Sequence, residues 1–237
     1  MAFAVRWLGQ GGFLFTLGDK TLAVDPYLSD SVAQTDRFRR IPPIPVAPEA
    51  LRCDMALCTH DHQDHLDPDT IANTNLPLYA GPDSCVRHFM ALGIEESRIR
   101  ALNRGETLTL GEAALTGLFA RHTEDSIGVL IEYQGLRLYV TGDTEYDERL
   151  LDARKRDVDI LFICINGRLG NMNAPDAART AAGIGCRLAV PMHYGMFAEN
   201  TEDPAVFAEA LQPSGIPCFV MDFDTEYDVP GLLARAR

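Results

Sequence analysis

The sequence predicts an α/β fold in which two mixed sheets pack face to face, with helices on the outer faces. Short strand-like segments dominate the first third of the chain, and four more follow one another between Thr107 and Thr141. The later strands alternate with helical segments. Two stacked sheets with outer helices bury the apolar face of each such segment. At 237 residues, 46% of them hydrophobic, the chain can form one sizeable core, so we predict a single domain over residues 1–237.

The N-terminal strands are separated by turn signals. Gly-rich or Gly-Asp turns delimit three predicted strands, Ala2–Leu8, Phe13–Leu17 and Thr21–Val24. The glycines at 9 and 11 do not indicate a dinucleotide site, because Leu14 replaces the third glycine and a strand follows instead of a helix. Residues 41–50 are too rich in proline for a helix interior and are predicted to be an extended loop.

Helix and strand signals continue along the rest of the chain. A helix over Pro82–Leu92 has proline at its start and Gly93 just after its end. A helix over Glu145–Arg156 ends in basic residues, which suit the dipole at a helix C-terminus. Asn173 is the predicted N-cap of a third helix, Ala174–Ala182, with Gly183 after it. Further strands are predicted over Met55–Cys58, Asp159–Ile165 and Arg187–Pro191.

The segment Thr59-His-Asp-His-Gln-Asp-His65 contains three of the six histidines of the chain. Its core pattern is His60-x-His62-x-Asp64-His65. Neutral imidazoles and carboxylates are ligands that zinc or manganese accepts. Four such side chains within six residues exceed what one closed tetrahedral site takes from a single loop. The segment therefore predicts two adjacent metal ions.

Three further ligand-type residues follow apolar, strand-like segments. His122 comes after the apolar run 115–120, Asp143 after Leu136–Val140, and His193 after Arg187–Pro191. In α/β folds the ends of strands gather functional groups at one edge. His88 lies within a predicted helix, away from any strand end, and is interpreted as a surface or packing residue.

This order of residues resembles the metallo-β-lactamase fold superfamily of metallohydrolases. The matching features are His-x-His-x-Asp-His, one later His, an Asp in Thr141-Gly-Asp-Thr144 and a last His. The similarity is strongest to the branch that contains L-ascorbate-6-phosphate lactonase. It extends to Trp7-Leu-Gly-Gln-Gly-Gly-Phe13, Val24-Asp-Pro-Tyr-Leu-Ser-Asp30, Gly81-Pro-Asp-Ser-Cys85, Leu92-Gly-Ile94 and Gly105-Glu106. The resemblance implies a four-layer αββα sandwich with the metals at one edge.

The resemblance also implies a role for each ligand-type residue. His60, His62 and His122 would hold one metal, Asp64, His65 and His193 would hold a second, and Asp143 would bridge both. The implied cofactors are two divalent ions, zinc or manganese, with iron as a further alternative. A water shared by two cations becomes a hydroxide near neutral pH, so the implied reaction is hydrolysis of an ester, lactone or phosphoester.

The residues given catalytic roles are Asp64, Asp143 and His193. His62 favours hydrolysis, because the oxygen-reducing diiron members of the superfamily place Glu at that position. Substrate groups are expected from the loop Asn166–Asn173, where Arg168 could bind a phosphate or carboxylate. Asn173 and Tyr194 are further substrate-binding candidates, although a plain surface loop is an equally open interpretation. Asp61, Asp67 and Thr141 are the nearest candidates in sequence for partners that orient the ligands.

Composition limits the class of substrate and the cellular compartment that we expect for this protein. The formal net charge of −13 disfavours binding to nucleic acids, which require a basic surface. The one basic cluster, Arg37-Phe-Arg-Arg40, is either a solvated loop or a substrate contact. No apolar run is long enough to span a membrane, and the N-terminus lacks a secretory signal. Six scattered cysteines without a Cys-x-x-Cys pair predict reduced thiols and a cytoplasmic protein.

The sequence therefore predicts a metal-dependent hydrolase of a small anionic ester or lactone, which includes sugar-phosphate lactones. A phosphodiesterase or nuclease of the same fold is the alternative. A non-catalytic, metabolite-binding member is a third interpretation, although none of the seven ligand-type residues is missing. The expected partner is a small-molecule substrate, with neither nucleic acid nor membrane, and self-association into a homo-oligomer stays open.

Overall fold

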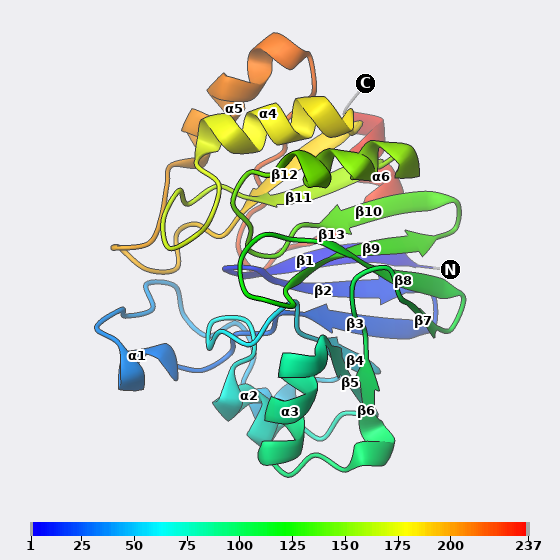
Figure 1. Ribbon diagram of the computed structural model, residues 1–237, viewed down its shortest axis with the longest axis vertical. Helices are drawn as coiled ribbons and strands as arrows, with labels where there is room; N and C mark the ends of the chain where they lie inside the picture. Colours follow the sequence, from blue (N-terminus) through cyan, green and yellow to red (C-terminus); the bar gives the residue numbers. More distant parts are fainter. Residues whose placement is uncertain (1, 236–237) are drawn as a thin grey trace.

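Two mixed sheets form the centre of the computed structural model, which describes residues 2–235 (Figure 1). The first sheet has the strand order β13-β1-β2-β3-β4-β5-β6. Its strands are β1 (Phe3–Gly9), β2 (Gly12–Leu17), β3 (Lys20–Val24), β4 (Met55–Leu57), β5 (Leu78–Gly81), β6 (Ile99–Ala101) and β13 (Glu226–Asp228). The second has the order β12-β11-β10-β9-β8-β7. Its strands are β7 (Thr107–Leu110), β8 (Ala113–Phe119), β9 (Ile127–Tyr133), β10 (Leu136–Val140), β11 (Ile160–Cys164) and β12 (Leu188–Met192).

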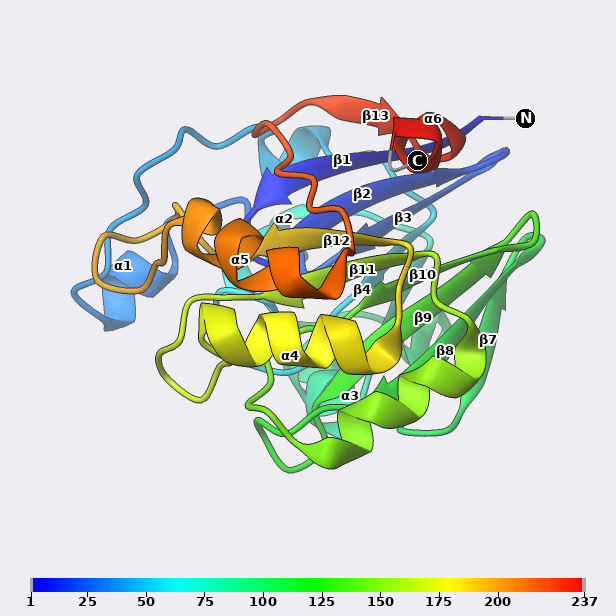
Figure 2. The same cartoon turned by 90° about the horizontal axis from the view of Figure 1, so that it is seen from above.

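Helices lie on the outside of the two sheets. The α-helices are α1 (Val32–Thr35), α2 (Pro68–Asn73), α3 (Asp83–Ala91), α4 (Ala174–Ile184), α5 (Pro204–Leu211) and α6 (Val229–Arg235). Four 3₁₀ helices are η1 (Pro48–Ala50), η2 (Glu96–Arg98), η3 (Glu148–Arg156) and η4 (Gln212–Ser214). Helices α2 and α3 lie at the bottom of Figure 1 and α4 and α5 at the top. Seen from above, α4 and α5 cover the second sheet (Figure 2). No helix in residues 2–235 is long and apolar enough to cross a membrane.

Aromatic side chains from both sheets interlock in the main core. Phe13 and Phe15 lie two residues apart on β2 and so point to the same face of the first sheet. Both meet Phe162 of β11 in the second sheet, with ring centroids 4.8 and 5.8 Å apart. All three side chains are fully buried. Burying apolar rings of this size stabilises the fold by about 2 kcal/mol each, so this contact holds the two sheets together.

Most predicted elements are confirmed, with bounds that shift by one to three residues. The four strands between Thr107 and Thr141 are β7 to β10. The helix predicted over Glu145–Arg156 is instead the 3₁₀ helix η3, which begins only after Asp147. Asp147 accepts a hydrogen bond from the backbone N–H of Arg149. The buried residues Leu150 and Ala153 are three positions apart, which places them on one side of a 3₁₀ helix.

The end of helix α4 also differs from the prediction. Gly183 lies inside the helix, which continues to Ile184 and closes on Gly185 in a left-handed conformation, with φ of 77°. A Cβ atom at Gly183 would lie 2.6 Å from Cδ2 of Leu151 in η3. Gly183 therefore lets α4 pack closely against Leu151 of η3, and Gly185 is the residue that ends the helix.

Several loops extend toward one end of the sheets. The loops after β11 and β12 and the segment that carries α1 all reach the left side of Figure 1. The loop after β12 is joined to the segment that follows α1, because the N–H of Ile41 donates to the carbonyl of Met196 at 2.8 Å. This end of the fold is the predicted position of the site.

Candidate metal centre

The loop that follows β4 carries four of the seven ligand-type side chains. A tight turn shapes it, in which the N–H groups of His65 and Leu66 both donate to the carbonyl of His62. Asp25 fixes the backbone of Thr59. The Asp25 carboxylate accepts one hydrogen bond from the N–H of Thr59 and one from the hydroxyl of Thr59, both at 2.7 Å. The local sequence thus forms a rigid turn that ends at α2, where Asp67 caps the first turn.

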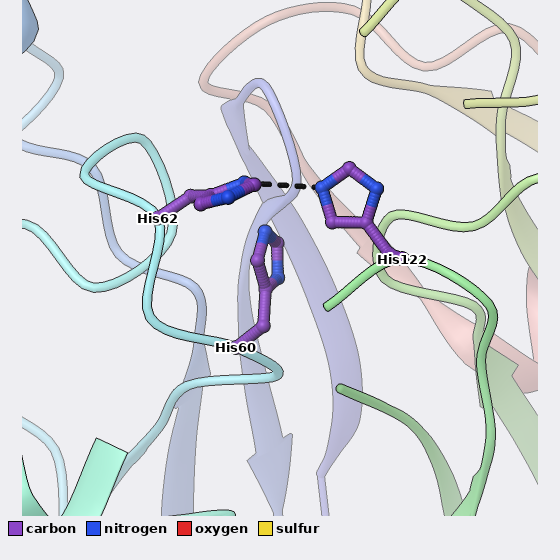
Figure 3. A group of neighbouring side chains, drawn as sticks. All are labelled: His60, His62 and His122. Atoms are coloured by element: carbon purple, nitrogen blue, oxygen red, sulfur yellow. Dashed lines mark hydrogen bonds between the residues drawn. The ribbon is translucent and has the colours of Figure 1, made fainter. Parts of the chain in front are cut away.

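Three imidazoles form the first set of ligand atoms, drawn in Figure 3. His60 and His62 come from the loop after β4, and His122 comes from the loop after β8. Nε2 of His122 and Nδ1 of His62 lie 3.0 Å apart. The ring of His60 lies 4.7 Å from that of His62 and 4.8 Å from that of His122. The three residues offer one nitrogen each within 4.8 Å of one another, a spacing that suits a shared cation.

The second set consists of Asp64, His65 and His193. Oδ2 of Asp64 lies 3.5 Å from Nε2 of His193 and 3.8 Å from Nε2 of His65. His193 follows β12 and has a left-handed backbone with φ of 63°, which is uncommon for a residue other than glycine. A strained backbone that directs a side chain into a site is typical of functional positions.

Asp143, which follows β10, lies between the two sets. Its Oδ1 is 3.1 Å from Nε2 of His65, and its Oδ2 is 3.1 Å from Nε2 of His193. Oδ2 is also 3.7 Å from Nε2 of His122 in the first set. One carboxylate therefore contacts histidines of both sets, as a residue shared by two cations must.

Unpaired polar atoms test whether these residues fit metal ions. Within residues 2–235, Nε2 of His60 is buried without a hydrogen-bond partner, and Nε2 of His65 and Oδ1 of Asp143 are buried with no neighbour for pairing except each other, at 3.1 Å. Such atoms are rare in folded proteins, because each loses its hydration without compensation. Imidazole nitrogens and carboxylate oxygens at this spacing are suitable ligands for zinc or manganese. The residues present therefore fit divalent cations.

Burial and mutual charge set the protonation of the cluster. Burial lowers the pKa of His60 well below its usual value, and the neighbouring His65 adds to that effect. Burial also lowers the pKa of His62, together with His122. For Asp143, burial favours the neutral acid, but His193 and His65 outweigh it and hold the pKa well below the usual range. For His193, burial is outweighed by Asp143 and Asp64, which raise the pKa to about 9. A bound cation would replace the protons that the cluster shares.

Residues from distant segments orient the ligands. Nδ1 of His65 donates to Oδ2 of Asp25 at 2.8 Å, and Nδ1 of His122 donates to the carbonyl of Gly170 at 2.9 Å. Nδ1 of His60 lies 3.1 Å from the hydroxyl of Thr59. The amides of two further residues donate to the carboxylates, Asn171 to Asp143 and Gln10 to Asp64, each at 2.7 Å.

The partners predicted from sequence proximity are wrong. Asp67 binds the N–H of Leu28 and caps α2, and Asp61 pairs with the exposed His88 at 3.5 Å. Thr141 donates to the carbonyl of Gly142. Apart from Thr59, which adjoins His60, the orienting residues were missed because they lie 28 to 54 positions away in the chain from the ligands that they contact. Asp25 carried one available signal, since it directly follows β3.

The three residues predicted to bind substrate, Arg168, Asn173 and Tyr194, lie in different environments. Arg168 is exposed on the loop whose Gly170 carbonyl binds His122. The side chain of Asn173 accepts from the N–H of Asp176 and so caps α4, as predicted. The ring of Tyr194 packs 4.8 Å from that of Trp7 and lines an apolar cavity of about 160 Å³. Of these candidates, Arg168 is the one that carries a charge, and it is exposed to solvent.

The basic cluster is not uniformly solvated. The side chain of Arg40 is only 4% exposed, and its guanidinium lies 4.3 Å from the ring centroid of Tyr27. It donates to the carbonyls of Tyr27 and Ser29. Arg40 thus joins the segment after β3 to the segment after α1, whereas Arg37 is exposed.

Comparisons with known proteins show the family and the fold of this chain. The family model for the β-lactamase superfamily domain matches residues 20–194. The chain is 28% identical over 229 residues to a protein of Archaeoglobus fulgidus named UPF0173 metal-dependent hydrolase, covering 90% of this chain and 92% of that protein. A protein of the same name from Oenococcus oeni is 28% identical over 240 residues, covering 94% and 99%. The fold is similar to that of Igni18, a metallo hydrolase from Ignicoccus hospitalis, with a TM-score of 0.76, 18% identity and coverage of 96% and 98%.

Proposed function

We propose, on the premise that this chain belongs to the β-lactamase superfamily, that it is a metal-dependent hydrolase of a small anionic ester or lactone. Its two mixed sheets with outer helices are the metallo-β-lactamase fold, as predicted. The observation that carries the proposal is the position of Asp143, which contacts histidines of both ligand sets and groups with His60 and His65, one from each set. Similarity to proteins named metal-dependent hydrolases supports the same reaction class.

Each of the two ligand sets is proposed to hold one divalent cation. His60, His62 and His122 would hold one divalent cation, and Asp64, His65 and His193 the other, with Asp143 shared. Zinc and manganese both suit this donor set of imidazole and carboxylate. When bound, two such cations lower the pKa of water and polarise the bond that is cleaved.

The carboxylates differ in their access to solvent. The side chain of Asp64 is 17% exposed, whereas that of Asp143 is 5% exposed. Asp64 is therefore the carboxylate that can accept a hydrogen bond from an attacking water and orient it. Its pKa lies below the usual value, because His65 and His193 outweigh the effect of burial, so it is ionised at neutral pH. Asp143 and His193 would contribute as ligands that hold the cations beside the bond that is cleaved.

Arg168 supports an anionic substrate. It lies two residues from Gly170, whose carbonyl contacts His122, and its side chain is exposed at that position. A guanidinium binds a carboxylate or phosphate through paired hydrogen bonds. The net charge of −13 favours a small anion over a polyanion such as nucleic acid.

Metal analysis combined with a substrate screen tests the proposal. Purified protein would be analysed for bound metals, then assayed with zinc or manganese against lactones, carboxylic esters and bis(p-nitrophenyl) phosphate. We expect about two metals per chain and turnover of lactones or esters. Turnover confined to the phosphodiester would replace the proposal with a phosphodiesterase. A chain that binds no metal, even when metal is added, would overturn it.

A further inference from the structure

Gln10 has an unusual backbone at the turn between β1 and β2. Its side chain is fully buried, and its φ of 51° lies in the left-handed region that non-glycine residues seldom adopt. Glycines precede and follow it, at positions 9, 11 and 12. A long polar side chain therefore occupies the position of this turn where another glycine would relieve strain. Strain of this kind at a buried polar residue indicates a function.

The turn is fixed against the candidate metal centre. The carbonyl of Gln10 accepts hydrogen bonds from the N–H of His193 at 3.0 Å and from the indole N–H of Trp7 at 3.1 Å. On the other side, a Cβ atom at Gly11 would lie 2.8 Å from Cε1 of His65. The backbone around Gln10 thus contacts two residues of the second ligand set.

The side chain of Gln10 reaches the ligand atoms themselves. Its Nε2 donates to Oδ2 of Asp64 at 2.7 Å and lies 3.1 Å from Nε2 of His193. Those two ligand atoms are 3.5 Å from each other. The amide nitrogen therefore lies against both of them, while its partner atom Oε1 is buried and unpaired.

We propose that Gln10 is a positioning residue of the second cation site, whose amide N–H donates to Asp64 and holds that carboxylate in the orientation that a cation shared with His193 requires. The inference rests on the proposed function, because it assumes that Asp64, His65 and His193 bind a metal. Hydrogen-bond donors to ligating carboxylates fix their orientation before the metal arrives. Asn171 has the corresponding contact with Asp143, but Asp143 is shared by both sets, so of these two amides Gln10 is the one that contacts a carboxylate of a single set.

Zn²⁺ titration in competition with a chromophoric chelator tests this role without an activity assay. The variant Gln10→Met keeps the length of the side chain but removes the donor. We expect one of two binding events to weaken about 10- to 100-fold and the other to stay unchanged. The event is assigned in the His62→Ala background, which leaves only the second set intact. There, Gln10→Met should weaken the single remaining event by the same factor.

Trp7→Phe is the matched control, because it removes the other side-chain contact to this turn without touching a ligand. It should leave both Zn²⁺ affinities unchanged, whereas a merely structural turn would lose affinity in both variants. Circular dichroism checks folding, and if Gln10→Met fails to fold, the shorter amide of Gln10→Asn carries the same expectation. Wild-type protein that binds no Zn²⁺ would overturn the proposed function. Two wild-type events that Gln10→Met leaves intact, or weakens equally, would overturn only the role of Gln10.

Discussion

Asp25 and His65 form a fully buried hydrogen-bonded pair, with Nδ1 of His65 2.8 Å from Oδ2 of Asp25. The bond leaves Nε2 of His65 facing Asp143 at 3.1 Å. Because Asp25 also accepts from the N–H and hydroxyl of Thr59, one carboxylate orients a proposed ligand and the loop that carries it. A carboxylate behind a histidine fixes both its ring orientation and its tautomer.

Asp25→Ala should therefore destabilise the protein and weaken metal binding together. Removing the carboxylate leaves buried donors on His65 and Thr59 unpaired, which costs about 3 kcal/mol of the free energy of unfolding. Metal affinity should fall about 10- to 100-fold. Urea unfolding and metal titration measure the two effects. Asp61→Ala, which removes only a partly exposed contact with His88, should leave both values near wild type.

Loss of a shared or first-set ligand should abolish hydrolysis without unfolding the chain. Asp143→Ala and His62→Ala each remove a proposed ligand, so the activity supplied by the cations is lost, by at least about a hundredfold. Initial rates on the best substrate of the screen measure the effect, and circular dichroism checks the fold. His88→Ala is the control, since this exposed histidine lies outside the ligand sets. Near wild-type rates for Asp143→Ala would contradict the assignment.

Removal of metal should lower both activity and thermal stability. A cation that binds only the folded state stabilises it by about 2.7 kcal/mol when present at a hundred times its dissociation constant. Dialysis against a chelator should therefore lower the midpoint of thermal unfolding, and adding zinc or manganese should restore it. Differential scanning calorimetry before and after dialysis measures the shift. An unchanged midpoint in both states would mean that the ligand sets do not bind a cation under these conditions.

Arg168→Ala should raise KM for anionic substrates selectively. A charged hydrogen bond contributes about 1.5–3 kcal/mol, so KM for an anionic ester should rise at least about tenfold, with kcat less affected. The neutral analogue of the same ester should show little change. Steady-state kinetics on the matched pair of substrates distinguish the two cases. Arg37→Ala serves as the control, because Arg37 is an exposed arginine of the α1 segment.

Stability should fall at alkaline pH because of buried thiols, of which Cys53 and Cys186 are two. Burial raises the pKa of both Cys53 and Cys186 from 9.0 to about 12. Above pH 9 the unfolded chain therefore loses these protons while the folded chain keeps them, so the free energy of unfolding falls as pH rises. The slope approaches about 1.4 kcal/mol per pH unit for each thiol. Urea unfolding between pH 8 and 11 measures it, and Cys53→Ala with Cys186→Ala should reduce the slope.

Local sequence patterns predicted much of the secondary structure, because caps and turns depend on residues that are neighbours in the chain. Asn173 caps α4 as expected, since the cap needs only a side-chain oxygen three residues before a free N–H. The 3₁₀ form of η3 and the true end of α4 were not predictable in this way. Inside α4, Gly183 packs against Leu151 of η3, a contact between two separate elements that no local pattern indicates. Arg40 likewise looked like part of a solvated cluster until the fold placed it over Tyr27.

The sequence by itself determined which seven residues are ligand candidates, because His60, His62, Asp64 and His65 share one loop and the others end strands that meet at one edge. Tertiary structure alone decided what holds those residues in place. Asp25, Gln10 and Asn171 reach their partners across 28 to 54 positions of chain. Contacts at that separation depend on how the two sheets stack and how their loops converge, and short-range sequence patterns carry no information about either.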